Sequence, residues 1–174
     1  MIFVADSTVT KNALANALKR QMEEEPFSKI TVSEICDRCN MNRKSFYYHF
    51  KDKFDLVEWL FNSEVQNATG NKTYTDKWEY IEDICEVLCR DKRFYREIFQ
   101  IKGQNSLFEQ MLGLFCPFIT NELLNIEDSG FCAEFLSDSL IHSIEKWICG
   151  KENITSAEFV SNLKKSLLKA AEII

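Results

Sequence analysis

The sequence predicts an all-α protein, and three observations support this prediction. Only five Gly and two Pro occur among 174 residues, so few positions interrupt a helix. Apolar residues recur at helical spacing along most of the chain, and several of these stretches begin with a capping signal. Hydrophobic residues make up 45% and charged residues 28% of the chain, which is the balance expected of a globular protein.

The first predicted helix covers residues 7–24 and ends before Pro26. In the stretch ITVSEICDRC, Thr31 and Glu34 have the spacing of a capping box. This signal predicts the start of a second helix, over residues 32–39.

A third, short helix follows the residues NMN. Asn40 suits the left-handed conformation that ends a helix, and Asn42 is a suitable N-cap for a helix from residue 43 to residue 49 or 50. Two short helices joined by three residues, each with its own start signal, predict a helix-turn-helix.

The rest of the chain predicts longer helices. The stretch ATGNKTYT is expected to be a loop, and Pro117 is expected to kink the helix that contains it. The predicted architecture is a three-helix head with the helix-turn-helix over residues 1–53, followed by a larger C-terminal helical bundle domain over residues 54–174. The helices predicted after the head cover residues 52–67, 76–90, 92–101, 106–125, 130–149 and 156–173.

The charge is divided unevenly along the chain. The net charge is −6, but residues 1–53 carry nine Lys/Arg against seven Asp/Glu, while the remainder carries twelve against twenty. Five basic residues and one acidic residue lie between Arg38 and Lys53. A basic N-terminal patch on an acidic body favours steering toward a polyanion, although charge alone also fits a solvated surface.

The stretch NRKSFYYHF combines basic residues with aromatic rings. Phe46 and Phe50 lie one helical turn apart, so both can point into the core of the head. The other sides of this helix carry charged, phenol, hydroxyl and imidazole groups, which bind phosphate oxygens and base edges. These groups belong to Arg43, Lys44, Ser45, Tyr47, Tyr48 and His49, and the patch extends to Lys51 and Lys53.

Residues 30–61, ITVSEICDRCNMNRKSFYYHFKDKFDLVEWLF, resemble the DNA-binding segment of TetR-family transcription regulators. In that family the segment has a Thr-capped helix, a turn of small residues, a short recognition helix with an aromatic–Tyr pair, and a Lys that opens the fourth helix. Two departures are Asn40 in place of the usual Gly and Lys44 where relatives often have Gly or Pro. The matching positions are Thr31, Ile35, Arg43, Ser45, Phe46, Tyr47, His49, Phe50, Lys53 and Leu56.

The resemblance implies an operator in double-stranded DNA as the ligand of the head. It assigns phosphate contacts to Tyr47, His49 and Lys53. It assigns base contacts to the remaining outward residues. Among these, Arg43 or Lys44 is expected to bind guanine. The complete predicted DNA-binding set is Thr31, Ser33, Asn42, Arg43, Lys44, Ser45, Tyr47, Tyr48, His49, Lys51 and Lys53.

The C-terminal part loosely resembles the family members that regulate dihydroxyacetone-kinase operons. The resemblance implies a homodimer formed through the last two helices and a small-molecule effector. The apolar residues expected to support that dimer are Phe135, Ile141, Ile144, Ile148, Phe159, Leu163, Leu167 and Ile174.

Aromatic residues of the C-terminal part either line an effector pocket or pack as ordinary core, and both alternatives stay open. One member, His142, fits a buried polar group with satisfied hydrogen bonds better than a ligand contact. The candidate pocket residues are Trp78, Phe94, Phe99, Phe108, Phe115, His142 and Trp147.

Other classes of protein are disfavoured by the sequence. No apolar run approaches the ~20 residues of a membrane span. The seven Cys are an odd number without a disulfide framework, so we expect reduced thiols and a cytoplasmic protein. The pair Cys36 and Cys39 has no second pair to complete a metal site, so neither a metal nor another cofactor is expected. No catalytic fingerprint is found, and an enzyme is not expected.

Two functions from different classes therefore stay open. The first is a DNA-binding, ligand-responsive homodimeric repressor of the TetR type. The second is a TetR-like coactivator or protein-interaction module that acts through a partner protein. Salt-dependent binding to promoter DNA would favour the first, and tight co-purification with another protein without DNA binding would favour the second.

Overall fold

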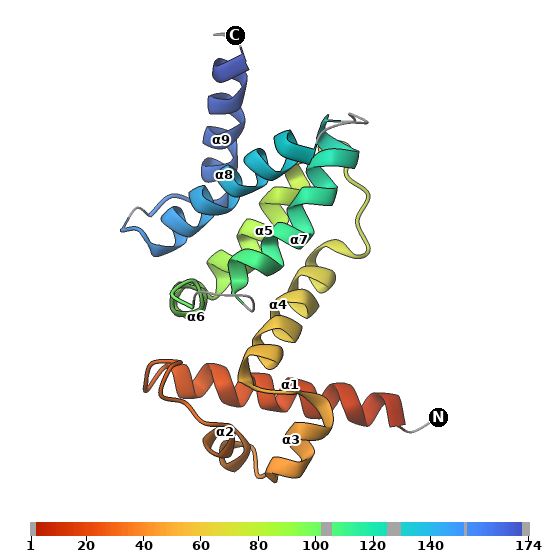
Figure 1. The fold of residues 1–174 in the computed structure, drawn as a ribbon, viewed down its shortest axis with the longest axis vertical. Helices are drawn as coiled ribbons and strands as arrows, with labels where there is room; N and C mark the ends of the chain where they lie inside the picture. Colours follow the sequence, from red (N-terminus) through yellow and green to blue (C-terminus); the bar gives the residue numbers. More distant parts are fainter. Residues whose placement is uncertain (1–2, 102–105, 125–129, 152, 172–174) are drawn as a thin grey trace. The chain divides into compact units, whose positions relative to one another are not determined.

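The computed structural model describes residues 3–101, 106–124, 130–151 and 153–171, and this part of the chain is helical without any strand (Figure 1). The predicted all-α class is confirmed. In chain order the helices are α1 (Phe3–Met22), α2 (Val32–Arg38), α3 (Arg43–His49), α4 (Lys53–Thr69), α5 (Trp78–Arg90), α6 (Lys92–Ile98), α7 (Leu107–Phe118), the π-helix η1 (Ile119–Leu124), α8 (Gly130–Cys149) and α9 (Ser156–Ala171).

The chain divides into two compact units, Met1–Ser63 and Glu64–Ile174. The division falls inside α4, so this helix contributes its first part to the head and its last part to the C-terminal unit. No helix in the described ranges combines the length and the apolar composition needed to cross a bilayer.

The core of the head is built from all four of its helical segments. Leu18 of α1, Ile35 of α2, Phe46 of α3 and both Leu56 and Phe61 of α4 are fully buried. Because α2 and α3 are too short to be stable alone, their position depends on this shared burial.

The local signals that define the helix-turn-helix are all present. The Thr31 amide donates to the Glu34 carboxylate over 2.7 Å, and the Glu34 amide donates to the Thr31 hydroxyl over 3.3 Å, which completes the capping box. The Asn42 carbonyl oxygen of the side chain accepts a hydrogen bond from the Ser45 amide over 2.8 Å. Asn40 has a φ of 54°, the left-handed conformation predicted for it.

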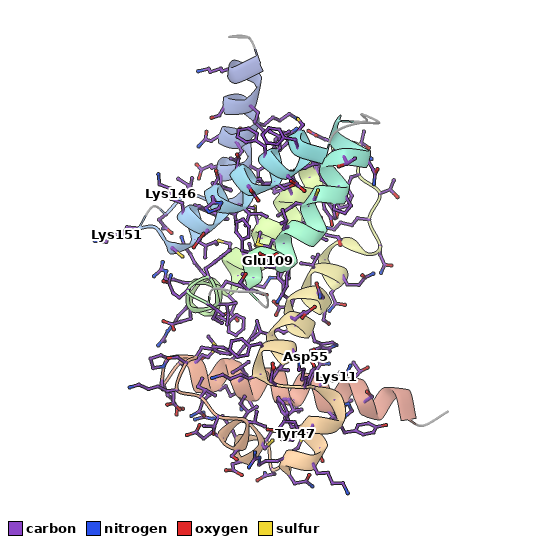
Figure 2. The ribbon with its side chains drawn as sticks, viewed as in Figure 1. Lys11, Tyr47, Asp55, Glu109, Lys146 and Lys151 are labelled. Carbon is purple, nitrogen blue, oxygen red and sulfur yellow. The ribbon has the colours of Figure 1, made fainter. Side chains whose placement is uncertain are left out.

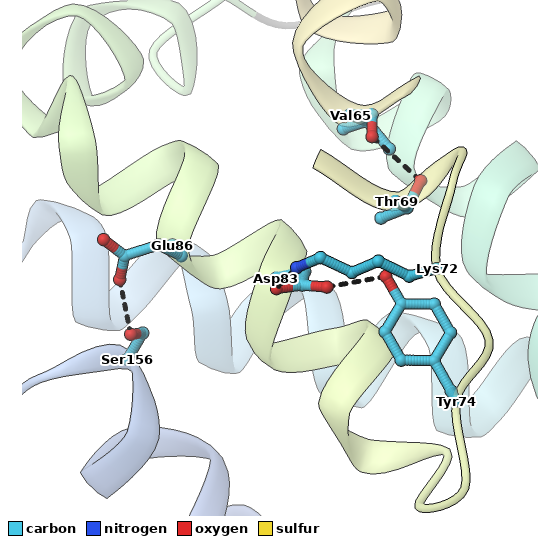
Figure 3. Close-up of polar contacts among 7 residues, drawn as sticks. All are labelled: Val65, Thr69, Lys72, Tyr74, Asp83, Glu86 and Ser156. Atoms are coloured by element: carbon cyan, nitrogen blue, oxygen red, sulfur yellow. Dashed lines mark hydrogen bonds and ion pairs between the residues drawn. The ribbon is translucent and has the colours of Figure 1, made fainter. Parts of the chain in front are cut away.

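In the C-terminal unit, α7 packs on α8 and α5 packs on α9 (Figure 1). Buried side chains of α5, α6, α7 and α8 fill the space between these helices. Polar contacts hold the edges of the unit (Figure 3). Asp83 of α5 accepts from Lys72 and Tyr74, each over 2.6 Å, so the loop after α4 is fixed to α5. The Ser156 hydroxyl, at the start of α9, donates to Glu86 of α5 over 2.7 Å.

The predicted helix boundaries differ from the structure at several points. The helix expected over residues 106–125 consists of α7, which contains Pro117, followed by the π-helix η1. Helix α6 ends at Ile98 rather than at residue 101, and α1 begins at Phe3 rather than at residue 7. The predicted ends at Asn125 and Ile173 lie outside the described residues.

Candidate nucleic-acid interface

Helix α3 has two chemically different sides. Phe46 and Phe50 are buried, with 0% and 3% of their surfaces exposed, and their ring centroids lie 5.7 Å apart. On the other side, Tyr47 is 51% exposed and Tyr48 is 82% exposed. Such exposure of two large rings beside a buried pair is typical of a surface that contacts another molecule.

The exposed side of α3 carries a positioned cation. The Arg43 guanidinium donates to the Tyr47 hydroxyl over 3.5 Å and lies 5.8 Å from the centre of the Tyr47 ring. The hydrogen bond to Tyr47 raises the pKa of Arg43. Lys44 beside it is exposed, and Tyr48 stacks edge to face on His49 with centroids 4.8 Å apart. Figure 2 shows Tyr47 among the side chains of the head.

The predicted DNA-binding residues do not all have free side chains. Thr31 and Asn42 are exposed, but their oxygens accept the capping hydrogen bonds of α2 and α3. The Ser45 hydroxyl, half-buried, donates to the Asn42 side chain over 3.2 Å. Lys51 is exposed, and Ser33 is half-buried. The capping hydrogen bonds fix where α2 and α3 begin. The exposed residues that do not cap a helix form the cationic and phenolic surface of α3.

Lys53 has a role that the sequence alone did not indicate. Its ammonium lies 2.7 Å from the carbonyl oxygens of Phe27 and Ile30 and 3.4 Å from that of Ser28. It also lies 4.5 Å from the centre of the Phe27 ring. Burial lowers the pKa of Lys53, and the carboxylates of Glu34 and Glu25 oppose this shift. The ammonium therefore faces the connection between α1 and α2, and we leave it out of the phosphate contacts proposed below.

The candidate effector residues lie in three environments. Phe94, Phe99, Phe115 and Trp147 are buried, Trp78 and Phe108 are half-buried, and His142 is exposed. The expectation that His142 is buried was wrong, because its ring lies on the outer side of α8. There Nδ1 lies 2.9 Å from the Asp138 carbonyl oxygen, and the ring packs on Phe108 with centroids 4.9 Å apart. A groove between α8 and α9 is lined by Trp147 but by none of the other six candidate effector residues.

Gln110 of α7 was not singled out by the sequence. Its side-chain nitrogen and oxygen are both buried, and neither has a hydrogen-bonding partner among the residues that the structure describes. Burial without a partner costs an amide about 1–3 kcal/mol. No periodicity or motif marks such a residue, since a polar residue near the edge of an apolar helix face is usually solvated.

Two family models match this chain. One, described as bacterial regulatory proteins of the tetR family, matches residues 14–60. The other, described as a transcriptional regulator C-terminal region, matches residues 76–169, more than half of the 174 residues.

A curated relative and several solved structures are also similar. The HTH-type dhaKLM operon transcriptional activator DhaS of Lactococcus lactis is 25% identical over 96 residues, which cover 55% of this chain and about half (51%) of that protein. A solved dihydroxyacetone kinase operon activator DhaS has a TM-score of 0.73 at 18% identity, with 96% of this chain and 98% of that chain covered. A regulator from Streptococcus agalactiae 2603V has a TM-score of 0.65 at 20% identity, with 91% and 93% covered. The two structures show the shared fold.

Proposed function

Since this chain belongs to the TetR family of transcriptional regulators, we propose that it binds an operator in double-stranded DNA as a homodimer and represses transcription until a small-molecule effector binds. We place this activity in the cytoplasm, where the DNA is. The head over residues 1–53 would bind DNA, and the C-terminal domain over residues 54–174 would bind the effector and the second subunit.

The exposed side of α3 is the observation that carries this proposal. Buried Phe46 and Phe50 hold the helix, and Arg43, Lys44 and Tyr48 face outward. A guanidinium and an ammonium at the start of a recognition helix can donate to guanine O6 and N7 in the major groove. Tyr47, His49 and Lys51 surround them as phosphate contacts.

The test of DNA binding uses a fluorescent duplex from the region upstream of the gene itself. We expect the anisotropy of this duplex to rise with protein concentration, and the affinity to fall steeply between 50 and 200 mM salt, as phosphate neutralisation requires. A shuffled duplex of the same length is the control, and it should bind more weakly at every salt concentration. Equal affinity for both duplexes, or no binding at low salt, would contradict the proposal.

The effector part of the proposal is supported by Gln110. A buried amide with an unused donor and an unused acceptor can bind a small molecule that offers a hydroxyl or carbonyl group. In this mechanism the dimer has two conformations that differ in the distance between its two DNA-binding heads. The effector must bind one conformation more tightly than the other, because only differential affinity shifts a conformational equilibrium.

Replacing Gln110 by Leu should stabilise the protein in the absence of any effector. The change removes an unpartnered buried amide at similar volume, so the free energy of unfolding should rise by about 1–2 kcal/mol and Tm by a few degrees. Thermal unfolding followed by circular dichroism measures this change. Gln66→Leu, at an exposed position of α4, is the control and should change stability by no more than about 0.5 kcal/mol. A lower Tm for Gln110→Leu would mean that the amide already has a bonding partner.

A second candidate function is activation of transcription. The relative of 25% identity is named as a transcriptional activator. If this chain also activates transcription, it acts through a partner protein. Reporter expression from the bound promoter separates the two candidates. Deletion of the gene raises expression for a repressor and lowers it for an activator.

A further inference from the structure

The buried ring of Phe46 determines which residues of α3 lie farthest from the core of the head. Phe46 is 0% exposed and sits in the middle of the helix. Successive residues of an α-helix are rotated by about 100°, so Lys44 and Tyr48, two residues before and two residues after the ring, each lie about 160° around the helix from it. These two residues form the outermost side of α3.

The other polar residues lie on the two flanks of α3. Arg43 and Tyr47 are on one flank, about 60° and 100° from Phe46, and Ser45 and His49 are on the other flank. The Arg43 guanidinium donates to the Tyr47 hydroxyl over 3.5 Å and lies 5.8 Å from the centre of its ring. This contact holds the guanidinium on its own flank.

Lys44 and Tyr48 have no such contacts at their polar ends. Lys44 is exposed and makes no hydrogen bond, ion pair or ring contact with any residue that the structure describes. Tyr48 is 82% exposed, and it contacts the ring of His49 edge to face, while its hydroxyl has no partner within the described ranges. One helical turn separates the two residues, about 6 Å along the axis.

A helix in the major groove meets base edges with its outermost side and phosphates with its flanks. The groove is about 12 Å wide, close to the diameter of a helix with its side chains, so the helix fits between the two phosphate backbones. A lysine ammonium can donate to guanine O6 and N7, and an apolar surface can contact the C5-methyl group of thymine. A separation of about 6 Å spans about two base steps of 3.4 Å.

We propose that Lys44 and Tyr48 determine the base specificity of the head: Lys44 binds a guanine, and the ring of Tyr48 covers the methyl group of a thymine about two base pairs away. Arg43 and Tyr47 then contact phosphates on one side of the groove. The inference rests on the proposed function, DNA binding by α3, and assigns the roles within this helix. The sequence leaves Arg43 and Lys44 as equal candidates for guanine, and the position of the buried ring distinguishes them.

Base analogues in the DNA test the two contacts one atom or group at a time. A duplex selected from a random pool by the protein serves as the operator. In one half-site, each thymine is replaced by deoxyuridine, which lacks only the methyl group, and each guanine by 7-deazaguanine, which lacks only the N7 acceptor. We expect one deoxyuridine to lower the affinity about 3- to 5-fold for the protein but not for Tyr48→Ala. One 7-deazaguanine should lower it about 5-fold or more for the protein but not for Lys44→Met.

Arg43→Met is the matched control, because it removes a charge from the neighbouring position of the same helix. It should weaken binding to all duplexes by a similar factor, lower the slope of log affinity against log salt by about 0.9, and leave both analogue effects in place. Circular dichroism should be the same for all three variants, since the three side chains are exposed.

Three results would overturn the assignment while leaving DNA binding intact. They are loss of the 7-deazaguanine effect in Arg43→Met rather than in Lys44→Met, persistence of the deoxyuridine effect in Tyr48→Ala, and a protein that is indifferent to every deoxyuridine. Failure to select any sequence from the pool would instead contradict the proposed function itself.

Discussion

Replacing Phe46 by Ala is expected to lower the free energy of unfolding of the head by about 3–5 kcal/mol. The ring is 0% exposed, and it packs on the rings of Tyr47 and Phe50 with centroids 5.5 and 5.7 Å away. A seven-residue helix cannot hold its conformation without tertiary packing, so α3 should lose its order together with this contact. Urea denaturation with segment-resolved hydrogen exchange measures the loss and shows whether it is confined to the head.

The matched control for this change is Tyr48→Ala, two residues along the same helix. Tyr48 is largely exposed, so its removal should change the free energy of unfolding by no more than about 0.5 kcal/mol, yet it should weaken DNA binding. If both variants destabilised the head equally, the division of α3 into a buried side and a DNA-facing side would be wrong.

The helix-turn-helix could be predicted in detail because its signals are local. The Thr31–Glu34 capping box, the Asn42 cap and the left-handed Asn40 each depend on neighbours within three residues. Hydrophobic spacing likewise predicted the inward direction of Phe46 and Phe50. Such features need no knowledge of the rest of the fold.

Features that depend on distant residues could not be predicted in this way. The π-helix η1 replaces the usual helical bonding after α7, and no residue pattern in the sequence marks it. The exposure of His142 and the burial of the Gln110 amide depend on how α7 and α8 rotate against their neighbours, which periodicity alone leaves undetermined. The partners of Lys53 lie more than twenty residues earlier in the chain.

Lys53 can either contact a DNA phosphate or stabilise the head through backbone carbonyls, and the two roles predict different effects of its substitution. A lysine at this place resembles the family's phosphate contact, but here its ammonium lies 2.7 Å from the carbonyl oxygens of Phe27 and Ile30. Lys53→Met keeps the aliphatic stem and removes the charge. We expect the free energy of unfolding of the head to fall by about 1.5–3 kcal/mol, the range for hydrogen bonds to a charged donor.

The same variant should leave the salt dependence of DNA binding unchanged at a temperature where the head stays folded. Each phosphate contact contributes about 0.9 to the slope of log affinity against log salt, so a residue without such a contact contributes nothing to it. Lys51→Met, an equal change at an exposed lysine two positions away, should instead lower the slope by about 0.9 and preserve stability. If Lys53→Met lowered the slope without loss of stability, the ammonium would have to leave the three carbonyls on binding DNA. The connection between α1 and α2 would then be held by the buried side chains of Phe27 and Ile30 and by the ion pair between Glu24 and Arg38.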